Sequence, residues 1–173
     1  MLSKIDTAGS GMVARPDQDR RTVLRGLAAA LAVGLAGAAL GALASAAPAL
    51  AGTALSAPDA HAQARAGKIV LIDVRSPREW RDTGVPDGAK LVTIHHPQGA
   101  RGFLRGILAA AGGDKSRPIA LICARGVRSS RGKRFLEANG FTNVIDVPEG
   151  MLGRGAAPGW LARKLPIRRC AVC

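Results

Sequence analysis

The chain has 173 residues, enough for one ordinary domain with an appendage but too few for two full domains. It carries 25 Lys and Arg against 12 Asp and Glu, a formal charge of +13, which first suggests nucleic acid as a partner. The basic residues are scattered, however, and three Phe, two Trp and no Tyr offer little for stacking. Nucleic-acid binding is therefore not expected, and small anions or an acidic partner protein fit the charge better.

The first 51 residues have the composition of a targeting segment. The basic stretch "DRRTVLR" at 19–25 precedes an uncharged Ala/Gly-rich run at 26–47. A pair of arginines before a mildly apolar segment resembles a twin-arginine export signal. The run is also long enough for an uncleaved membrane anchor, which would be the chain's only attachment to a membrane. Either interpretation places the rest of the chain in the periplasm.

Two small-x-small sites compete for cleavage, one ending at Ala51 and the other at Ala64. The second lies inside "LSAPDAHAQARAGK", where Ser56 and Asp59 have the spacing of a capping box at a helix start. Cleavage there would remove most of that helix. We therefore expect cleavage after Ala51 and a domain over residues 52–173.

That domain alternates short apolar runs with helical segments. The branched apolar runs predict buried strands at 68–73, 90–94, 118–122 and 143–147. Helical patterns separate them: one capped by Ser76 and Glu79, one within 102–113, and one from about Ser129 to Ala138. Strands separated by helices imply βαβ units, hence an α/β fold with a mostly parallel central sheet and helices on both faces.

Cys123 directly follows the third predicted strand, in "ICARGVRSSRG". Ligands of such sheets bind at the carboxyl ends of the strands, where helix N-termini point. The backbone amides of the loop and the dipole of the next helix can bind an anion there, and Gly126 permits the tight turn. The same dipole, with Arg125 and Arg128, favours the thiolate form of the cysteine. The loop therefore predicts a sulfur nucleophile with an anion beside it.

Three segments, "LIDVRSPREWRDTGVPDGAKLV", "ICARGVRSS" and "PEGMLGRGAAPGWLARKLPI", together resemble a single-domain rhodanese, a sulfurtransferase. The resemblance covers about residues 55–167. It implies a cysteine that takes the outer sulfur of thiosulfate as a persulfide and passes it to cyanide or a thiol, a protein thiol included, without cofactor or metal. By position, Cys123 is the nucleophile. The implied substrate-binding residues are Ala124, Arg125, Gly126, Val127 and Arg128.

Two other functions are alternatives to sulfur transfer. A cysteine phosphatase needs five residues between its cysteine and arginine, whereas four separate Cys123 from Arg128, so phosphatase activity is not expected. A non-catalytic rhodanese-like module that binds a partner through its basic surface is the second alternative. The intact cysteine and the full-length loop favour the sulfurtransferase.

Several further polar residues call for an interpretation. Asp73, Arg75 and Glu79 are expected to tie the end of the first strand to the following turn. His95 and His96 are adjacent, so on a strand they would face opposite ways, and no catalytic role is expected for them.

Cys170 and Cys173 at the chain end leave three alternatives open. They form a local disulfide, or a pair that exchanges sulfur with Cys123, or loose thiols at a frayed end. A zinc site would need more ligands than this tail offers.

The export signal is tested by replacing Arg20 and Arg21 with lysine. The precursor should stay in the cytoplasm, because the twin-arginine receptor reads the guanidinium pair, and fractionation with immunoblotting measures this. A mature N-terminus at Gly52 would support cleavage after Ala51. Unchanged periplasmic yield would point instead to the general secretory route or to membrane insertion.

Overall fold

The computed structural model describes residues 54–173. The export signal or anchor predicted for residues 1–51 therefore lies outside the described residues. Within the described part, no helix is both long enough and apolar enough to cross a membrane.

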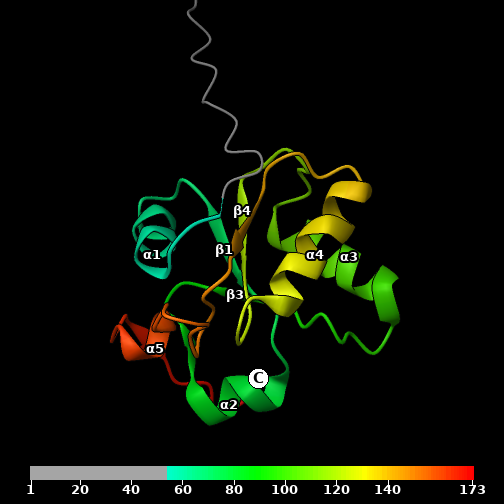
Figure 1. The fold of residues 1–173 in the computed structure, drawn as a ribbon. Coiled ribbons are helices and arrows are strands. Elements are labelled where there is room, and N and C mark those ends of the chain that lie inside the picture. The colour runs from blue at the N-terminus through cyan, green and yellow to red at the C-terminus, as the bar shows by residue number, and fades with distance from the viewer. Residues whose placement is uncertain (1–53) are drawn as a thin grey trace, which may run out of the picture. The chain divides into compact units, whose positions relative to one another are not determined.

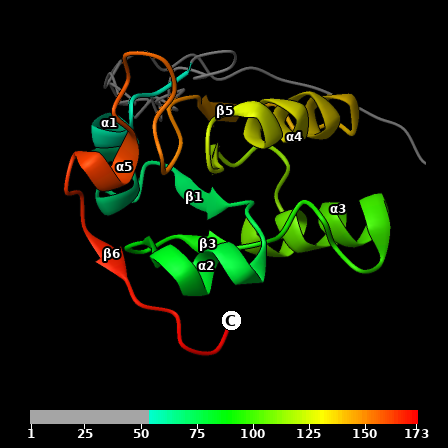
Figure 2. The same ribbon diagram turned by 60° about the horizontal axis from the view of Figure 1, so that its bottom comes forward.

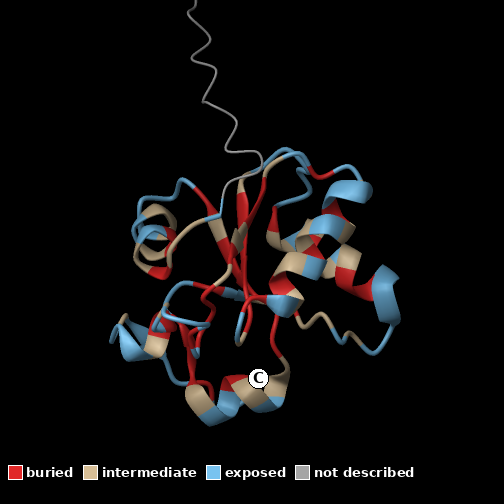
Figure 3. Cartoon of the chain, in the orientation of Figure 1, coloured by how far each residue is buried: buried red, intermediate tan, exposed pale blue. Residues whose placement is uncertain are grey.

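A four-stranded parallel sheet forms the centre of the domain, as the sequence predicted (Figure 1). Its strand order is β3-β1-β4-β5, and every neighbouring pair is parallel. The strands are β1 (Val70–Asp73), β3 (Lys90–Leu91), β4 (Ile119–Ile122) and β5 (Val144–Val147). The strands at the centre are almost wholly buried, which explains their continuous apolar sequence (Figure 3).

Helices cover both faces of this sheet, which confirms the expected α/β architecture. In Figure 1 the sheet stands between α1 on one side and α3 and α4 on the other, and Figure 2 shows α5 beside α1. The helices are α1 (Ala57–Arg65), α2 (Pro77–Thr83), α3 (Gly99–Ala110), α4 (Val127–Ala138) and α5 (Gly159–Ala162). Because strand side chains alternate, Ile72 packs in the core under α3 and α4, while Leu71 packs in the core with α1 and α5.

The structure differs from the sequence-based boundaries at several elements, among them the start of β1 (Val70, not residue 68) and the span of α3 (Gly99–Ala110, not within 102–113). Strand β3 ends at Leu91 instead of residue 94, because the chain turns at Ile94. The amides of Val92 and Ile94 still donate hydrogen bonds to the carbonyls of Asp73 and Val74. Helix α4 begins at Val127, since Gly126 takes a left-handed conformation (φ 83°) and serves as the N-cap. A small antiparallel pair of β2 (Val85–Pro86) and β6 (Ile167–Arg168) was not predicted.

A buried ion pair joins the end of β1 to α2. Arg75 and Asp73 are 1% and 0% exposed, and their Nη2 and Oδ2 atoms lie 2.7 Å apart. The same guanidinium donates to the Thr83 hydroxyl and the Gly84 carbonyl, each at 2.7 Å. These bonds pair the buried charge of Asp73 and confirm that Asp73 and Arg75 tie the strand end to the turn that follows.

The C-terminal tail is docked against α2. Cys170 and Cys173 form a disulfide with Cα atoms 5.9 Å apart, and Cys170 packs with Trp80 and Val85. Arg81 of α2 donates to the carbonyl of Cys173 at 3.1 Å, and the terminus lies beside α2 in both views (Figures 1 and 2). Of the three alternatives for these cysteines, the structure contains the local disulfide, and the chain end is not frayed.

Removal of this disulfide should loosen the tail. The double variant Cys170→Ser/Cys173→Ser should lose about 2 kcal/mol of unfolding free energy, the value expected from the chain entropy of so short a loop. Urea denaturation measures the loss. A reductant should lower the stability of the wild type by a similar amount and leave the double variant unaffected. Equal stabilities of the oxidised wild type and the variant would contradict the prediction.

Candidate active site

Cys123 lies directly after β4, at the carboxyl edge of the sheet, and begins the cysteine loop (residues 123–128). It is a free cysteine and is only 1% exposed. Its Sγ accepts a hydrogen bond from the Gly126 amide at 3.1 Å and lies 3.5 Å from the Ser129 hydroxyl. The sulfur therefore faces an amide donor and the first turn of α4.

A second loop, residues 148–153, packs against the cysteine loop backbone to backbone. The amides of Met151 and Leu152 donate to the carbonyls of Cys123 and Ala124, each at 2.9 Å. Gly150 has φ 64°, and a Cβ there would lie 2.5 Å from the Ala124 carbonyl oxygen. Only glycine fits at this position without displacing the cysteine loop.

Arg128 is paired with Glu79 of α2. Its two terminal nitrogens donate to the two carboxylate oxygens of Glu79 at 2.7 and 2.5 Å. The sequence predicts that Arg128 binds a substrate anion, whereas in the structure its partner is Glu79. The hydrogen bond from Arg128 is the largest of the causes that lower the pKa of Glu79 from 4.5 to about 2. The pKa of Arg128 is raised, first by its hydrogen bond to Glu79 and to a lesser degree by the charges of Glu79, Cys123 and Asp73.

The other loop residues that were predicted to bind substrate differ in how firmly the surrounding structure holds them. Arg125 donates to the Gly153 carbonyl through one nitrogen at 3.3 Å, a single long bond. The Ala124 carbonyl is bound to the second loop, and the side chain of Val127 is 62% exposed. The loop therefore presents one loosely held guanidinium, one paired guanidinium and an exposed apolar side chain.

A pocket of about 300 Å³ adjoins the loop between α3 and α4. It is lined by Ile94, His95, His96, Gly99, Ala100, Phe103, Arg128, Arg131 and Phe135. His95 and His96 do not lie on a strand, because β3 ends at Leu91, and both line this pocket from the segment that precedes α3. His96 Nδ1 accepts from the Gln98 amide at 3.1 Å, which holds its ring in place.

Two buried polar residues were missed by sequence analysis. Glu149, at 5% exposure, accepts hydrogen bonds from the amides of Ala57 and Gly159 and from Arg163 Nε, at 2.5, 3.0 and 2.9 Å. Burial raises the pKa of Glu149, but these hydrogen bonds outweigh it and the net shift is downward. Ser129 is the other missed residue, and a serine in the first turn after the cysteine was the available signal. Glu149 had no comparable local signal.

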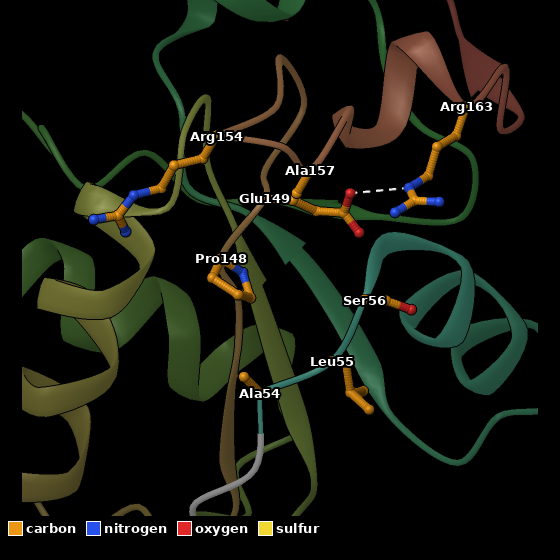
Figure 4. A pocket seen from close by; sticks show the side chains of 8 residues that line it. All are labelled: Ala54, Leu55, Ser56, Pro148, Glu149, Arg154, Ala157 and Arg163. Carbon is orange, nitrogen blue, oxygen red and sulfur yellow. Dashed lines mark hydrogen bonds and ion pairs between the residues drawn. The ribbon is translucent and has the colours of Figure 1, made fainter.

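Glu149 also lines a second pocket, on the side of the sheet that α1 and α5 cover (Figure 4). The figure shows Arg163 turned toward Glu149, while Arg154 points away from this pair. No residue of the cysteine loop is among those that line this pocket. We therefore assign the Glu149 cluster to holding α1 and α5 against the second loop.

Comparison with known proteins identifies the family. The profile of the rhodanese-like domain matches residues 56–154, more than half of the chain, with Cys123 inside the match. The chain belongs to the rhodanese-like domain family, whose general activity is sulfur transfer.

Individual relatives agree with this assignment. The solution structure of the 30 kDa polysulfide-sulfur transferase homodimer from Wolinella succinogenes is 29% identical, with a TM-score of 0.51 over 67% of this chain and 77% of that one. A crystal structure from M. tuberculosis is 28% identical, with a TM-score of 0.52 over 68% and 97%. An uncharacterised protein of Rickettsia prowazekii is 28% identical over 98 residues, 56% of this chain and 80% of its own length.

The Glu79–Arg128 ion pair should make the free energy of unfolding depend on pH in the acidic range. Because the pKa of Glu79 is lowered to about 2 on folding, its contribution is complete well above pH 4.5 and is lost as the pH falls through about 2. The urea midpoint of Glu79→Gln should therefore lie below that of the wild type at pH 7, and the gap should narrow between pH 4.5 and 2.

The control for this measurement is Asp82→Asn, which removes an exposed i,i+4 pair with Arg78. Exposed pairs of this kind contribute little, so its midpoint should stay close to that of the wild type throughout. A gap for Glu79→Gln that is constant from pH 7 to pH 2 would show that the ion pair does not stabilise the fold.

Proposed function

We propose that this domain is a sulfurtransferase that carries sulfane sulfur on Cys123 as a persulfide. The proposal rests on the free thiol of Cys123. Its sulfur accepts a hydrogen bond from the Gly126 amide at 3.1 Å, just before the N-terminus of α4. Thiosulfate is the proposed donor. The W. succinogenes relative is described as a polysulfide-sulfur transferase, which makes polysulfide a second donor with the same chemistry.

In the first half-reaction the Cys123 thiolate attacks the outer sulfur of thiosulfate. A new S–S bond forms at Cys123, the bond between the two sulfurs of thiosulfate breaks, and its electron pair leaves with sulfite. The Gly126 amide stabilises the negative Cys123 sulfur before this step, and after it the negative charge lies on the outer sulfur of the persulfide. Arg125, which is part of the cysteine loop and is held by one long hydrogen bond, attracts the dianionic donor.

In the second half-reaction cyanide or a thiol attacks the outer sulfur of the persulfide. The electron pair of the broken S–S bond returns to Cys123, which restores the thiolate. The 1% exposure of the resting cysteine favours small nucleophiles over large ones at this point. A persulfide extends one atom beyond Sγ, so an acceptor needs to reach only the outer sulfur.

The domain is further proposed to act in the periplasm. The twin-arginine-like segment supports this location, and so does the Cys170–Cys173 disulfide, because disulfides persist mainly in oxidising compartments. A local disulfide in the tail also leaves Cys123 without a competing thiol partner.

The central test is Cys123→Ser. The variant should fold like the wild type, because the hydroxyl is nearly isosteric with the thiol, yet it should form no thiocyanate from thiosulfate and cyanide. Wild-type protein incubated with thiosulfate should gain one sulfur atom by intact mass, and Cys170→Ser/Cys173→Ser should gain it as well. Full activity of a folded Cys123→Ser would overturn the proposal. No gain of sulfur by the wild type would favour the non-catalytic, partner-binding alternative.

A further inference from the structure

The pocket between α3 and α4 is built from the same packing cluster as the thiol. Phe103 and Cys123 belong to one buried cluster, and Ile94 and Phe135 pack against it. These three apolar side chains, Ile94, Phe103 and Phe135, also line the pocket. Arg128, the last residue of the cysteine loop, lines it too. The pocket therefore borders the cysteine loop at Arg128 and shares apolar side chains with the cluster that contains Cys123, and its volume of about 300 Å³ fits a small molecule.

The rim of the pocket is basic. Among the described residues no carboxylate lines it, whereas Arg128, Arg131, His95 and His96 do. Arg128 and Arg131 are three residues apart on α4, with Phe135 four residues further, so all three share one face of the helix. The pocket thus joins an apolar interior to a cationic edge.

Of the two arginines on this rim, Arg131 has the fewer hydrogen-bond and ion-pair partners. Arg128 is engaged by both oxygens of Glu79. Within the part of the chain that the structure describes, the Arg131 side chain makes no ion pair or hydrogen bond, while that of Arg134, three residues on, donates to the Ser130 hydroxyl at 3.0 Å. An exposed guanidinium above an apolar pocket is a suitable partner for a carboxylate.

We propose that this pocket binds the sulfur acceptor, and that the acceptor is a low-molecular-weight thiol carrying a carboxylate. This inference rests on the proposed function and adds the acceptor class to it. The aliphatic arm of the thiol packs on Phe103 and Phe135, and its carboxylate binds Arg131. A cationic thiol is rejected by the same rim, because no carboxylate in the pocket compensates its charge.

The transfer step is balanced without a further reactant. The acceptor thiolate attacks the outer sulfur of the Cys123 persulfide, and its electron pair forms the new S–S bond. The bond between the two persulfide sulfurs breaks, and its electron pair returns to Cys123 as thiolate. The proton lost by the acceptor thiol ends on the transferred sulfur, so the product is an acceptor persulfide.

Single-turnover discharge separates this inference from the proposed function. The full chain is first loaded with thiosulfate, and the gain of one sulfur atom is confirmed by intact mass. It is then mixed with 3-mercaptopropionate, 2-mercaptoethanol or cysteamine, and the rate of sulfur loss is corrected for the thiolate fraction of each thiol. The corrected rate should be highest for the anionic thiol and lowest for the cationic one.

The matched variants are Arg131→Gln and Arg134→Gln, which remove the same charge from the same helix. A charge-assisted hydrogen bond contributes enough for Arg131→Gln to lower the preference for 3-mercaptopropionate over 2-mercaptoethanol by about tenfold. Arg134→Gln should leave that ratio unchanged, which separates a local contact from the general attraction of a basic protein. Arg131→Lys should recover part of the ratio and shows that the position tolerates substitution.

Equal corrected rates for the three thiols would overturn the inference, and so would equal ratios in the two Gln variants. Both results leave the sulfurtransferase proposal intact, because the persulfide has already formed at the loading step. Failure of the proposed function would appear earlier, as protein that gains no sulfur.

Discussion

Two backbones in contact at the carboxyl edge of the sheet determine the shape of this site. The cysteine loop and the second loop meet without intervening side chains, and two hydrogen bonds of 2.9 Å join them. Gly126 and Gly150 make the approach feasible: a Cβ on the first would collide with the Pro148 carbonyl, and one on the second would collide with the Ala124 carbonyl. Because the second loop holds the backbone of the cysteine loop in this way, the Gly126 amide can face the sulfur of Cys123.

Helix α2 links this loop to the rest of the domain. Its N-terminal carboxylate, Glu79, completes the capping box with Ser76 and also binds both nitrogens of Arg128. The buried Arg75–Asp73 pair fixes the preceding turn, and the disulfide of the tail packs on Trp80 from the other side. Arg128 is thus pre-positioned by contacts that extend to Cys173, which would lower the entropy cost of binding the proposed anion.

Arg125, Arg128 and Arg131 differ in their roles because they differ in their partners. Arg128 is oriented by a carboxylate and contributes a fixed positive field near the sulfur. Arg125 and Arg131 are held weakly or not at all by the described residues, and they lie on different elements, one in the cysteine loop and one on α4. In the proposed reaction, a donor and an acceptor would therefore meet different cations.

The sequence by itself determined the features that depend on neighbours along the chain. Apolar runs predicted the four parallel strands, Ser76 and Glu79 predicted the start of α2, and the position of Cys123 between a strand and a helix placed it at the carboxyl edge. These features depend on hydrogen bonds and side-chain periodicity within a few residues, so local pattern is sufficient to read them.

Only the tertiary structure decided which distant groups meet. Glu79 and Arg128 are 49 residues apart, and Arg81 is 92 residues from the carbonyl of Cys173 to which it donates. The early end of β3, which turns both His95 and His96 into one pocket, depends on how residues 92–98 pack against α3. Such contacts are chosen by the packing of complete elements, where many pairings of the same charges and apolar side chains compete, and no local pattern distinguishes the one that forms.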